Sequence, residues 1–265
     1  MMKFPIDHDL HCHSCRSSCS GNEKQTKEAI LAHAKANGYS VQCVTDHLWD
    51  KDVPGASDWY APQDIEHVRA GLPLPQDDQV RMIFGCETEY CGKGKLGLHP
   101  DHYDQFDFIV IPPDHFHMVN FVRPDSYDSE EKIAGLLVER LEEISQMDLP
   151  WKKVGIAHMT CGLIFTEGDE CLVYRLVDEA RFRAVMRRFA GLGAGIEINC
   201  SCFGPGWREH EDDHLRLYRL AKEEGCKFYL ASDAHHPHEL SCVPERAPEI
   251  VELLGLTGEH LFRIP

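Results

Sequence analysis

Short apolar runs alternate with helical patterns along most of the chain, and this alternation limits the fold more than any other feature. Apolar runs predict strands at residues 6–12, 41–45, 80–86, 106–111, 154–157, 195–198 and 228–231. Patterns of helical spacing predict helices at 22–38, 63–70, 130–146, 178–192, 215–224 and 245–254. Strands separated by helices form parallel sheets, so the sequence predicts an α/β fold. Without a linker-like segment or an internal repeat, we expect one domain over residues 1–265.

Each predicted strand ends on or near a polar side chain of a type that binds metals or positions a metal ligand. The carboxyl ends of parallel strands share one rim of a sheet or barrel, so these side chains are expected to converge there. They are His11, His13, Asp46, His47, Glu87, His115, His158, Asn199, Asp233 and His235. His11 and His13 are two residues apart, which places both rings on one face of a strand.

The converging set holds more imidazoles and carboxylates than a single metal ion binds. A catalytic zinc ion takes three or four protein ligands, and calcium prefers oxygen ligands alone. We therefore expect two or three divalent transition metal ions, with zinc, manganese and iron as the candidates. Ions at close spacing favour in-line displacement at phosphorus, because they generate hydroxide and neutralise charge on the phosphate oxygens.

The composition argues against several other classes of protein. A formal net charge of −17 disfavours an extended nucleic-acid surface, which needs a basic stripe. The sequence has no run of 18 apolar residues, so no membrane span is expected. The 12 cysteines follow no secretory leader, which favours a reducing, cytoplasmic setting where Cys43 and Cys86 are buried thiols.

The polar strand ends also match, in order, the motifs of a known family. The matching segments are residues 9–14, 45–47, 85–87, 115, 156–158, 197–199 and 232–235. This ordered set resembles the polymerase and histidinol phosphatase (PHP) superfamily over roughly residues 6–254. The resemblance implies a distorted (β/α)7 TIM-like barrel with parallel strands, a trinuclear metal site and hydrolysis of phosphate esters. A chain without a polymerase region is most similar to the stand-alone histidinol-phosphatase branch.

The resemblance also implies which residues hold each metal ion. One ion would be bound by His11, His13, Glu87 and Asp233. Glu87 would bridge to a second ion bound by His115 and His158, and a third would be bound by His47 and His235. Asp46 and Asn199 are expected to orient metal ligands without binding metal themselves.

Cys19 stands where the family often has a further histidine or aspartate. A thiolate ligand at this position would favour zinc. Alternatively, the third site is weak or empty, or Cys19 is an ordinary loop thiol.

Several other residues offer rival or additional roles. The segment 210–214 satisfies H-E-x-x-H, but its charged surroundings predict an exposed helix start rather than a protease helix. His117 is the alternative ligand if His115 is assigned two residues out of register. Arg16 and Arg208 follow strand ends in loops, from which they could hold the phosphate oxygens of a substrate.

These observations predict a cytoplasmic, metal-dependent phosphoesterase, a hydrolase most like the histidinol phosphatases. Its substrate would be a small-molecule phosphomonoester, with L-histidinol phosphate as one candidate. A metal-bridging hydroxide would attack phosphorus, and no protein nucleophile is assigned. Two alternatives stay open: an exonuclease or nucleotide phosphatase using the same metal centre, and a non-catalytic metal-binding regulatory module.

Overall fold

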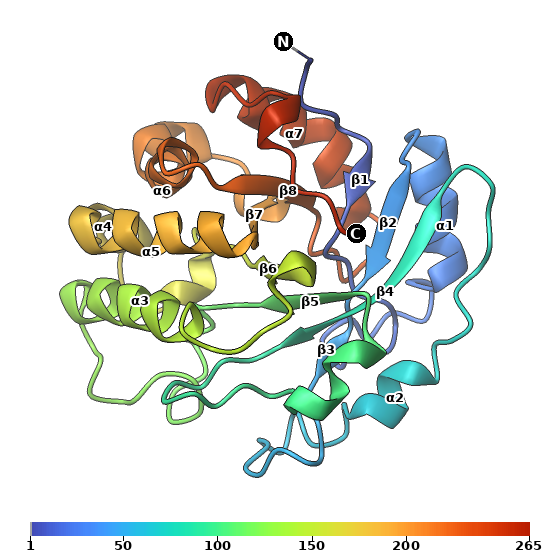
Figure 1. The fold of residues 1–265 in the computed structure, drawn as a ribbon, viewed down its shortest axis with the longest axis horizontal. Helices are drawn as coiled ribbons and strands as arrows, with labels where there is room; N and C mark the ends of the chain where they lie inside the picture. Colours follow the sequence, from blue (N-terminus) through green and yellow to red (C-terminus); the bar gives the residue numbers. More distant parts are fainter. Residues whose placement is uncertain (1) are drawn as a thin grey trace.

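Strands and helices alternate along the chain in the computed structural model, which describes residues 2–265 (Figure 1). The strands are β1 (His8–Asp9), β2 (Val41–Val44), β3 (His47–Leu48), β4 (Arg81–Thr88), β5 (Phe108–Ile111), β6 (Val154–Ile156), β7 (Gly195–Asn199) and β8 (Lys227–Ala231). The helices are α1 (Lys27–Ala36), α2 (Ile65–Arg69), α3 (Glu130–Ile144), α4 (Glu170–Leu176), α5 (Glu179–Leu192), α6 (Glu211–Glu223) and α7 (Cys242–Leu253). The predicted strand and helix alternation is therefore present.

The strands form a parallel sheet that curls into a barrel, in the order β1-β2-β4-β5-β6-β7-β8. The two end strands, β1 and β8, lie side by side (Figure 1). They are joined by a hydrogen bond of 3.0 Å from Leu10 N to Leu230 O and by a parallel bridge between Cys12 and Ala234. The result is a nearly closed, all-parallel barrel with one seam, which confirms the predicted TIM-like architecture.

The strand predicted at 6–12 is regular only over His8–Asp9, and two elements, β3 and α4, were not predicted. The strand predicted at 41–45 is followed, after a break at Thr45 and Asp46, by β3, which pairs with β4 so that His47 lies opposite Glu87. Helix α4 was not predicted, because seven residues contain too few turns to show an apolar period. Its N-terminus is capped by the Asp169 carboxylate, which accepts a hydrogen bond from Leu172 N.

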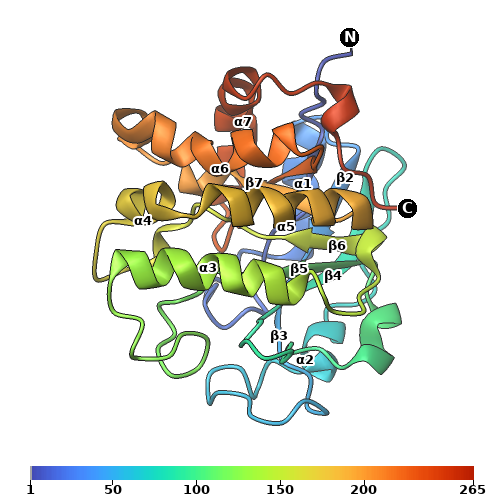
Figure 2. The same cartoon turned by 60° about the vertical axis from the view of Figure 1, so that its left-hand side comes forward.

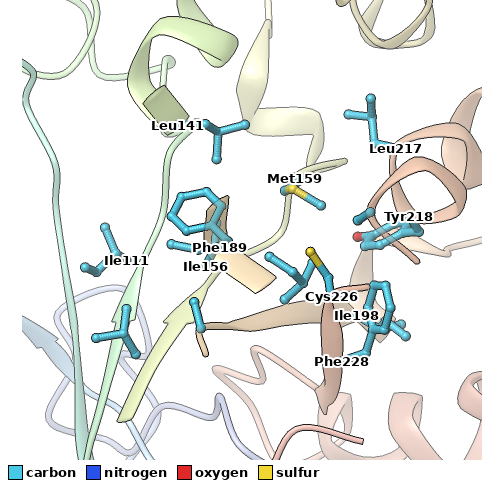
Figure 3. Close-up of a cluster of buried hydrophobic side chains, with 14 of the residues drawn as sticks. Ile111, Leu141, Ile156, Met159, Phe189, Ile198, Leu217, Tyr218, Cys226 and Phe228 are labelled. Carbon is cyan, nitrogen blue, oxygen red and sulfur yellow. The ribbon is translucent and has the colours of Figure 1, made fainter. Parts of the chain in front are cut away.

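The main core lies between the outer face of the sheet and the helices around it. Figure 3 shows Ile156 of β6 beside Phe189 of α5, with Leu141 of α3 near them, and Phe228 of β8 beside Ile198 and Cys226. Figure 2 shows α3, α5 and α6 stacked over one side of the barrel. Burial of these apolar faces is the main force that holds the helices on the sheet.

A second apolar cluster fills the interior of the barrel. Its buried members are Leu10, Cys43, Ile83, Phe108, Val110, Ala157, Tyr229, Ala231 and Phe262. Gly155 makes room for two of these rings, because a Cβ at this position would lie 2.6 Å from Phe108 and would overlap the Tyr229 hydroxyl. The interior is therefore apolar below the rim, and polar side chains are concentrated at the carboxyl ends of the strands.

No helix within residues 2–265 is long and apolar enough to cross a membrane.

Candidate metal centre

His11 and His13 follow β1 and turn their Nε2 atoms toward each other at 3.1 Å. The Nδ1 atom of His11 is 2.9 Å from Glu197 Oε2, and that of His13 is 2.9 Å from Ser17 Oγ. Ser17 Oγ donates to Asp46 Oδ1 at 2.7 Å, so it accepts from the imidazole. Both Nδ1 atoms therefore carry the proton, and two Nε2 lone pairs face one another, an arrangement that a shared cation stabilises.

Glu87 lies at the carboxyl end of β4, in the middle of the histidines. Its Oε2 is 3.6 Å from His11 Nε2, 3.4 Å from His13 Nε2 and 2.8 Å from His47 Nδ1. Its Oε1 is 3.5 Å from His158 Nε2 and 3.9 Å from His115 Nε2. Within residues 2–265 neither oxygen makes a hydrogen bond of acceptable geometry, although the side chain is 1% exposed. A buried carboxylate of this kind needs positive charge on both sides.

Asp233 follows β8 and completes the first group of ligand atoms. Its Oδ1 is 3.1 Å from His13 Nε2 and 3.5 Å from His11 Nε2, and its Oδ2 accepts a hydrogen bond from Asn199 Nδ2 at 3.1 Å. The backbone of Asp233 has a φ of 52°, in the left-handed region that costs energy for a residue other than glycine. Burial alone would raise the pKa of Asp233, but the neighbouring histidines outweigh it and hold that pKa well below its usual range.

Buried carboxylates fix the orientation of three of the histidines. Glu197 contacts His11 Nδ1 as described, Asp114 Oδ1 is 3.0 Å from His158 Nδ1, and Glu89 Oε1 is 2.5 Å from His115 Nδ1. Such pairs direct each Nε2 lone pair toward a common point. The sequence analysis assigned no role to these three carboxylates, although Glu197 lies in the matching segment 197–199 and Asp114 and Glu89 lie close to predicted ligands in sequence. Their contacts with the histidines appear only in the structure.

A third group of donors lies at the outer edge of the centre. His13, His47 and His235 each present a ligand atom within 4.8 Å of the other two. Cys19 lines the same cavity as His47 and His235. Burial raises the pKa of the Cys19 thiol, but interactions with His235 and His47 outweigh it and lower the pKa to about 7. The structure thus places Cys19 beside the third predicted site rather than in a remote loop.

A cavity of about 690 Å³ opens over the centre. Its lining includes the ligand-type side chains Cys19, His47, Glu87, His115, Asp233 and His235. It also includes the apolar and aromatic side chains Trp59, Tyr60, Met118, Phe121 and Leu163, and the Trp59 ring centroid is 5.1 Å from that of His47. Trp59 and Leu163 are 40% and 38% exposed, so both leave apolar surface open to solvent. No lysine or arginine is among the cavity-lining residues of the described chain.

The two arginines proposed as phosphate contacts lie elsewhere. The Arg16 guanidinium donates to the backbone oxygens of His67 and Ala70 at 3.0 and 2.9 Å. Arg208 pairs with Glu211 and Glu249 on the surface. Neither side chain lines the cavity in this structure, so their role in substrate binding remains a prediction without a supporting contact.

The remaining sequence candidates are placed as follows. Asp46 accepts hydrogen bonds from Ser14 and Ser17 and reaches His13 only through Ser17. His117 lines the cavity, but His115 is the residue whose Nε2 faces Glu87. The H-E-x-x-H segment lies at the start of α6, and none of its residues lines the cavity.

The donors present fit divalent transition metals. The clustered Nε2 atoms and carboxylate oxygens are the ligand types of zinc, iron and manganese. The His158 Nε2 atom and both Glu87 oxygens are buried and make no hydrogen bond within residues 2–265. Bound cations would satisfy all of these atoms at once, whereas hydrogen bonds within the described chain satisfy none of them.

Comparison with known proteins gives one sequence relative and several structural ones. The chain is 22% identical over 255 residues to a protein of Schizosaccharomyces pombe named "Probable histidinol-phosphatase", covering 87% of this chain and 82% of the relative. No family model matches the chain.

Solved structures share the fold. The histidinol phosphate phosphatase of Lactococcus lactis, in complex with zinc, L-histidinol and phosphate, superposes with a TM-score of 0.58 at 16% identity, covering 97% of this chain and 99% of that one. A candidate histidinol phosphatase of Listeria monocytogenes gives a TM-score of 0.58 at 12% identity, covering 88% and 96%. Taken with the ordered motifs and the parallel barrel, these similarities support the resemblance to the histidinol phosphatases of the PHP superfamily that the sequence shows.

Proposed function

We propose that this protein is a metal-dependent phosphoesterase that hydrolyses a small-molecule phosphomonoester, with L-histidinol phosphate as the first substrate to test. The observation that carries the proposal is the buried Glu87 carboxylate, which lies between two groups of imidazole Nε2 atoms without a hydrogen bond from the described chain. This is the arrangement of a carboxylate that bridges two cations. The similarity to histidinol phosphatases supports the same chemistry.

The proposal assigns the ligands as the sequence predicted them. His11, His13, Glu87 and Asp233 would hold one ion; Glu87, His115 and His158 a second; His47 and His235, with Cys19 beside them, a third. Cys19 supports zinc at the third position, because thiolates are soft ligands. When bound, the ions would activate water and neutralise charge on the phosphate.

The side chains around the ligands have a definite task in this scheme. Glu197, Asp114 and Glu89 keep the Nδ1 proton on their histidines, so that each Nε2 lone pair stays available. Asn199 holds Asp233 in its strained conformation by donating to Oδ2.

The twelve cysteines are all free thiols, which supports a reducing compartment such as the cytoplasm.

The cavity supports a small substrate with an uncharged or cationic leaving group. Its lining includes the partly exposed side chains of Trp59 and Leu163 beside the proposed metal ligands. Because no lysine or arginine among the described residues lines this space, the ions themselves would neutralise the phosphate. A flat imidazole such as that of L-histidinol fits against an indole face.

The decisive variant is Asp233→Asn, tested in protein reconstituted separately with zinc, manganese and iron. Asparagine tolerates the left-handed backbone, so the fold should persist while one anionic ligand is lost. We expect kcat for L-histidinol phosphate to fall roughly 10²–10³-fold. Phosphate release and bound metal are measured together. Unchanged turnover in the variant would mean that the activity does not come from this centre.

A further inference from the structure

A second group of ligand-type side chains lies outside the barrel mouth, where α4 packs against α6 (Figure 2). Glu170 and Cys171 begin α4, and His210, Asp213 and His214 belong to the H-E-x-x-H segment at the start of α6. None of the five lines the cavity of the metal centre, and the proposed phosphoesterase activity gives them no task.

The donor atoms of this group converge on the Cys171 thiol. Cys171 Sγ is 3.9 Å from His214 Nε2. Glu170, Cys171 and His214 each present a ligand atom within 4.8 Å of the other two, and so do Cys171, His210 and Asp213. With zinc bonds of about 2.3 Å to sulfur and about 2.0 Å to nitrogen, two ligands at a tetrahedral angle lie ~3.5 Å apart. The thiol and imidazole are already close to that separation.

The burial of two members of this group is a second observation in favour of a bound ion. Cys171 and His214 are each 5% exposed. Among the described residues, the Cys171 thiol is the only hydrogen-bond neighbour of His214 Nε2, and His214 Nδ1 has none. A buried imidazole in this state costs free energy unless another atom satisfies it.

The absence of a side chain at Gly162 leaves space for the Glu170 carboxylate. A Cβ at Gly162, in the loop after β6, would lie 2.7 Å from Glu170 Oε2. At the outer edge, Asp213 Oδ1 is 3.0 Å from Arg175 Nε, while its Oδ2 is 3.9 Å from His210 Nδ1. One oxygen of Asp213 is therefore neutralised and the other is available to the group.

We propose that Cys171, His214 and Glu170 bind a structural zinc ion, with His210 or Asp213 as the fourth ligand. Thiolate, imidazole and carboxylate together select zinc over calcium or magnesium, which bind oxygen atoms. The ion would tie α4 to α6 and so fix the loop between β6 and α4. On binding, the Cys171 thiol would release its proton to solvent.

The test compares Cys171→Ser with Cys226→Ser in metal-loaded protein after removal of loose metal. Cys226 is also a buried thiol, but it donates to Met186 O instead of facing a histidine. We expect Cys171→Ser to hold about one zinc ion fewer per chain than the wild type. The Cys226→Ser control should retain the wild-type zinc content, and phosphatase activity should persist in both variants. Equal zinc content in Cys171→Ser and wild type would overturn the site.

Two further measurements keep the test decisive if Cys171→Ser folds poorly. Glu170 is partly exposed and His210 is exposed, so Glu170→Gln and His210→Ala should leave the fold intact. Glu170→Gln should weaken zinc retention without loss of structure. In cobalt-substituted protein, the thiolate-to-metal absorption should survive Cys19→Ser and lose intensity in Cys171→Ser. An absorption that depends on Cys19 alone would exclude Cys171 as a ligand, whatever the outcome of the phosphatase assay.

Discussion

At the scale of single residues, the centre depends on side chains that orient the ligands. His11 is the clearest case: burial alone would lower its pKa, but Glu197, Asp233 and Glu87 outweigh burial and raise that pKa well above its usual value. The carboxylates thus stabilise positive charge at this point. Either bound metal ions or protons on the imidazoles can carry that charge, so metal binding should release protons.

Glu197→Gln tests the orienting role. The substitution keeps the size of the side chain but removes the charge that holds the Nδ1 proton on His11. We expect metal affinity to fall about 10–100-fold, because the Nε2 lone pair of His11 becomes a weaker and less well directed ligand. Competition with a chelator measures the change. Glu143→Gln is the control, since Glu143 pairs with Arg140 on α3, away from the centre; an equal loss there would point to a general effect.

The proposed ligands are recognisable in the sequence because each lies at or just after the carboxyl end of a strand, whereas the contacts of their supporting residues are not. Glu197 lies within β7 and in the matching segment 197–199, but the sequence gives no sign that its carboxylate contacts a histidine. Its role depends on the distance to His11, a residue 186 positions away. Arg16 shows the converse: a cation in a rim loop can turn to backbone oxygens instead of the cavity.

At the scale of elements, strongly periodic segments were predicted well and short ones were not. Helices α3 and α5 have several turns with one apolar face, so the helical spacing of their apolar residues is visible in the sequence. Helix α4 has seven residues and β3 has two, so each depends on tertiary contacts more than on local pattern. Both carry residues of the proposed metal sites, since β3 contains His47 and α4 contains Cys171.

The loop before α2, which carries Trp59, is attached to the barrel through Asp50. His102, in the short helix Pro100–Gln105, places Nδ1 2.5 Å from Asp50 Oδ2. The hydrogen bond with Asp50 raises the pKa of His102. A folded-state pKa above the unfolded value means that this stabilisation is complete below about pH 6.5 and is lost as the pH rises through the folded pKa.

We therefore expect His102→Gln to lower the free energy of unfolding at about pH 6 and to have little effect at about pH 9. The loss at pH 6 should be at most about 1 kcal/mol, because the imidazole is partly exposed to solvent. Urea unfolding at the two pH values measures the difference. His99→Gln is the control, since its imidazole faces Asp101 and only its backbone N–H, which the substitution keeps, donates to Asp50. A cost for His102→Gln that does not change with pH would contradict the role of the charged imidazole.

At the scale of the whole molecule, the metal centre lies across the seam of the barrel. Side chains close part of this seam: Asp9 accepts from Ser232 N and Oγ at 3.0 and 2.6 Å, and His8 Nε2 accepts from Leu230 N at 3.0 Å. The proposed ligands His11 and His13 follow β1, and Asp233 and His235 follow β8. Metal ions bound by both pairs would therefore cross-link the two edge strands that the sheet ladder leaves weakly joined.

This arrangement predicts that metal removal loosens the seam before the rest of the barrel. The amides of Leu10, His13 and Asp233 donate across it to Leu230, Ala234 and His11. We assume that the seam opens only after the metal is released. At a free metal concentration of about 100 times Kd, metal binding then adds about 2.7 kcal/mol to the free energy of opening. Chelation should then speed exchange of these amides by about 100-fold. Hydrogen exchange with mass spectrometry measures this, with the paired amides of β4 and β5 as the internal control. Equal acceleration in the seam and in that ladder would indicate global destabilisation instead, and unchanged exchange would show that the ions do not hold the seam together.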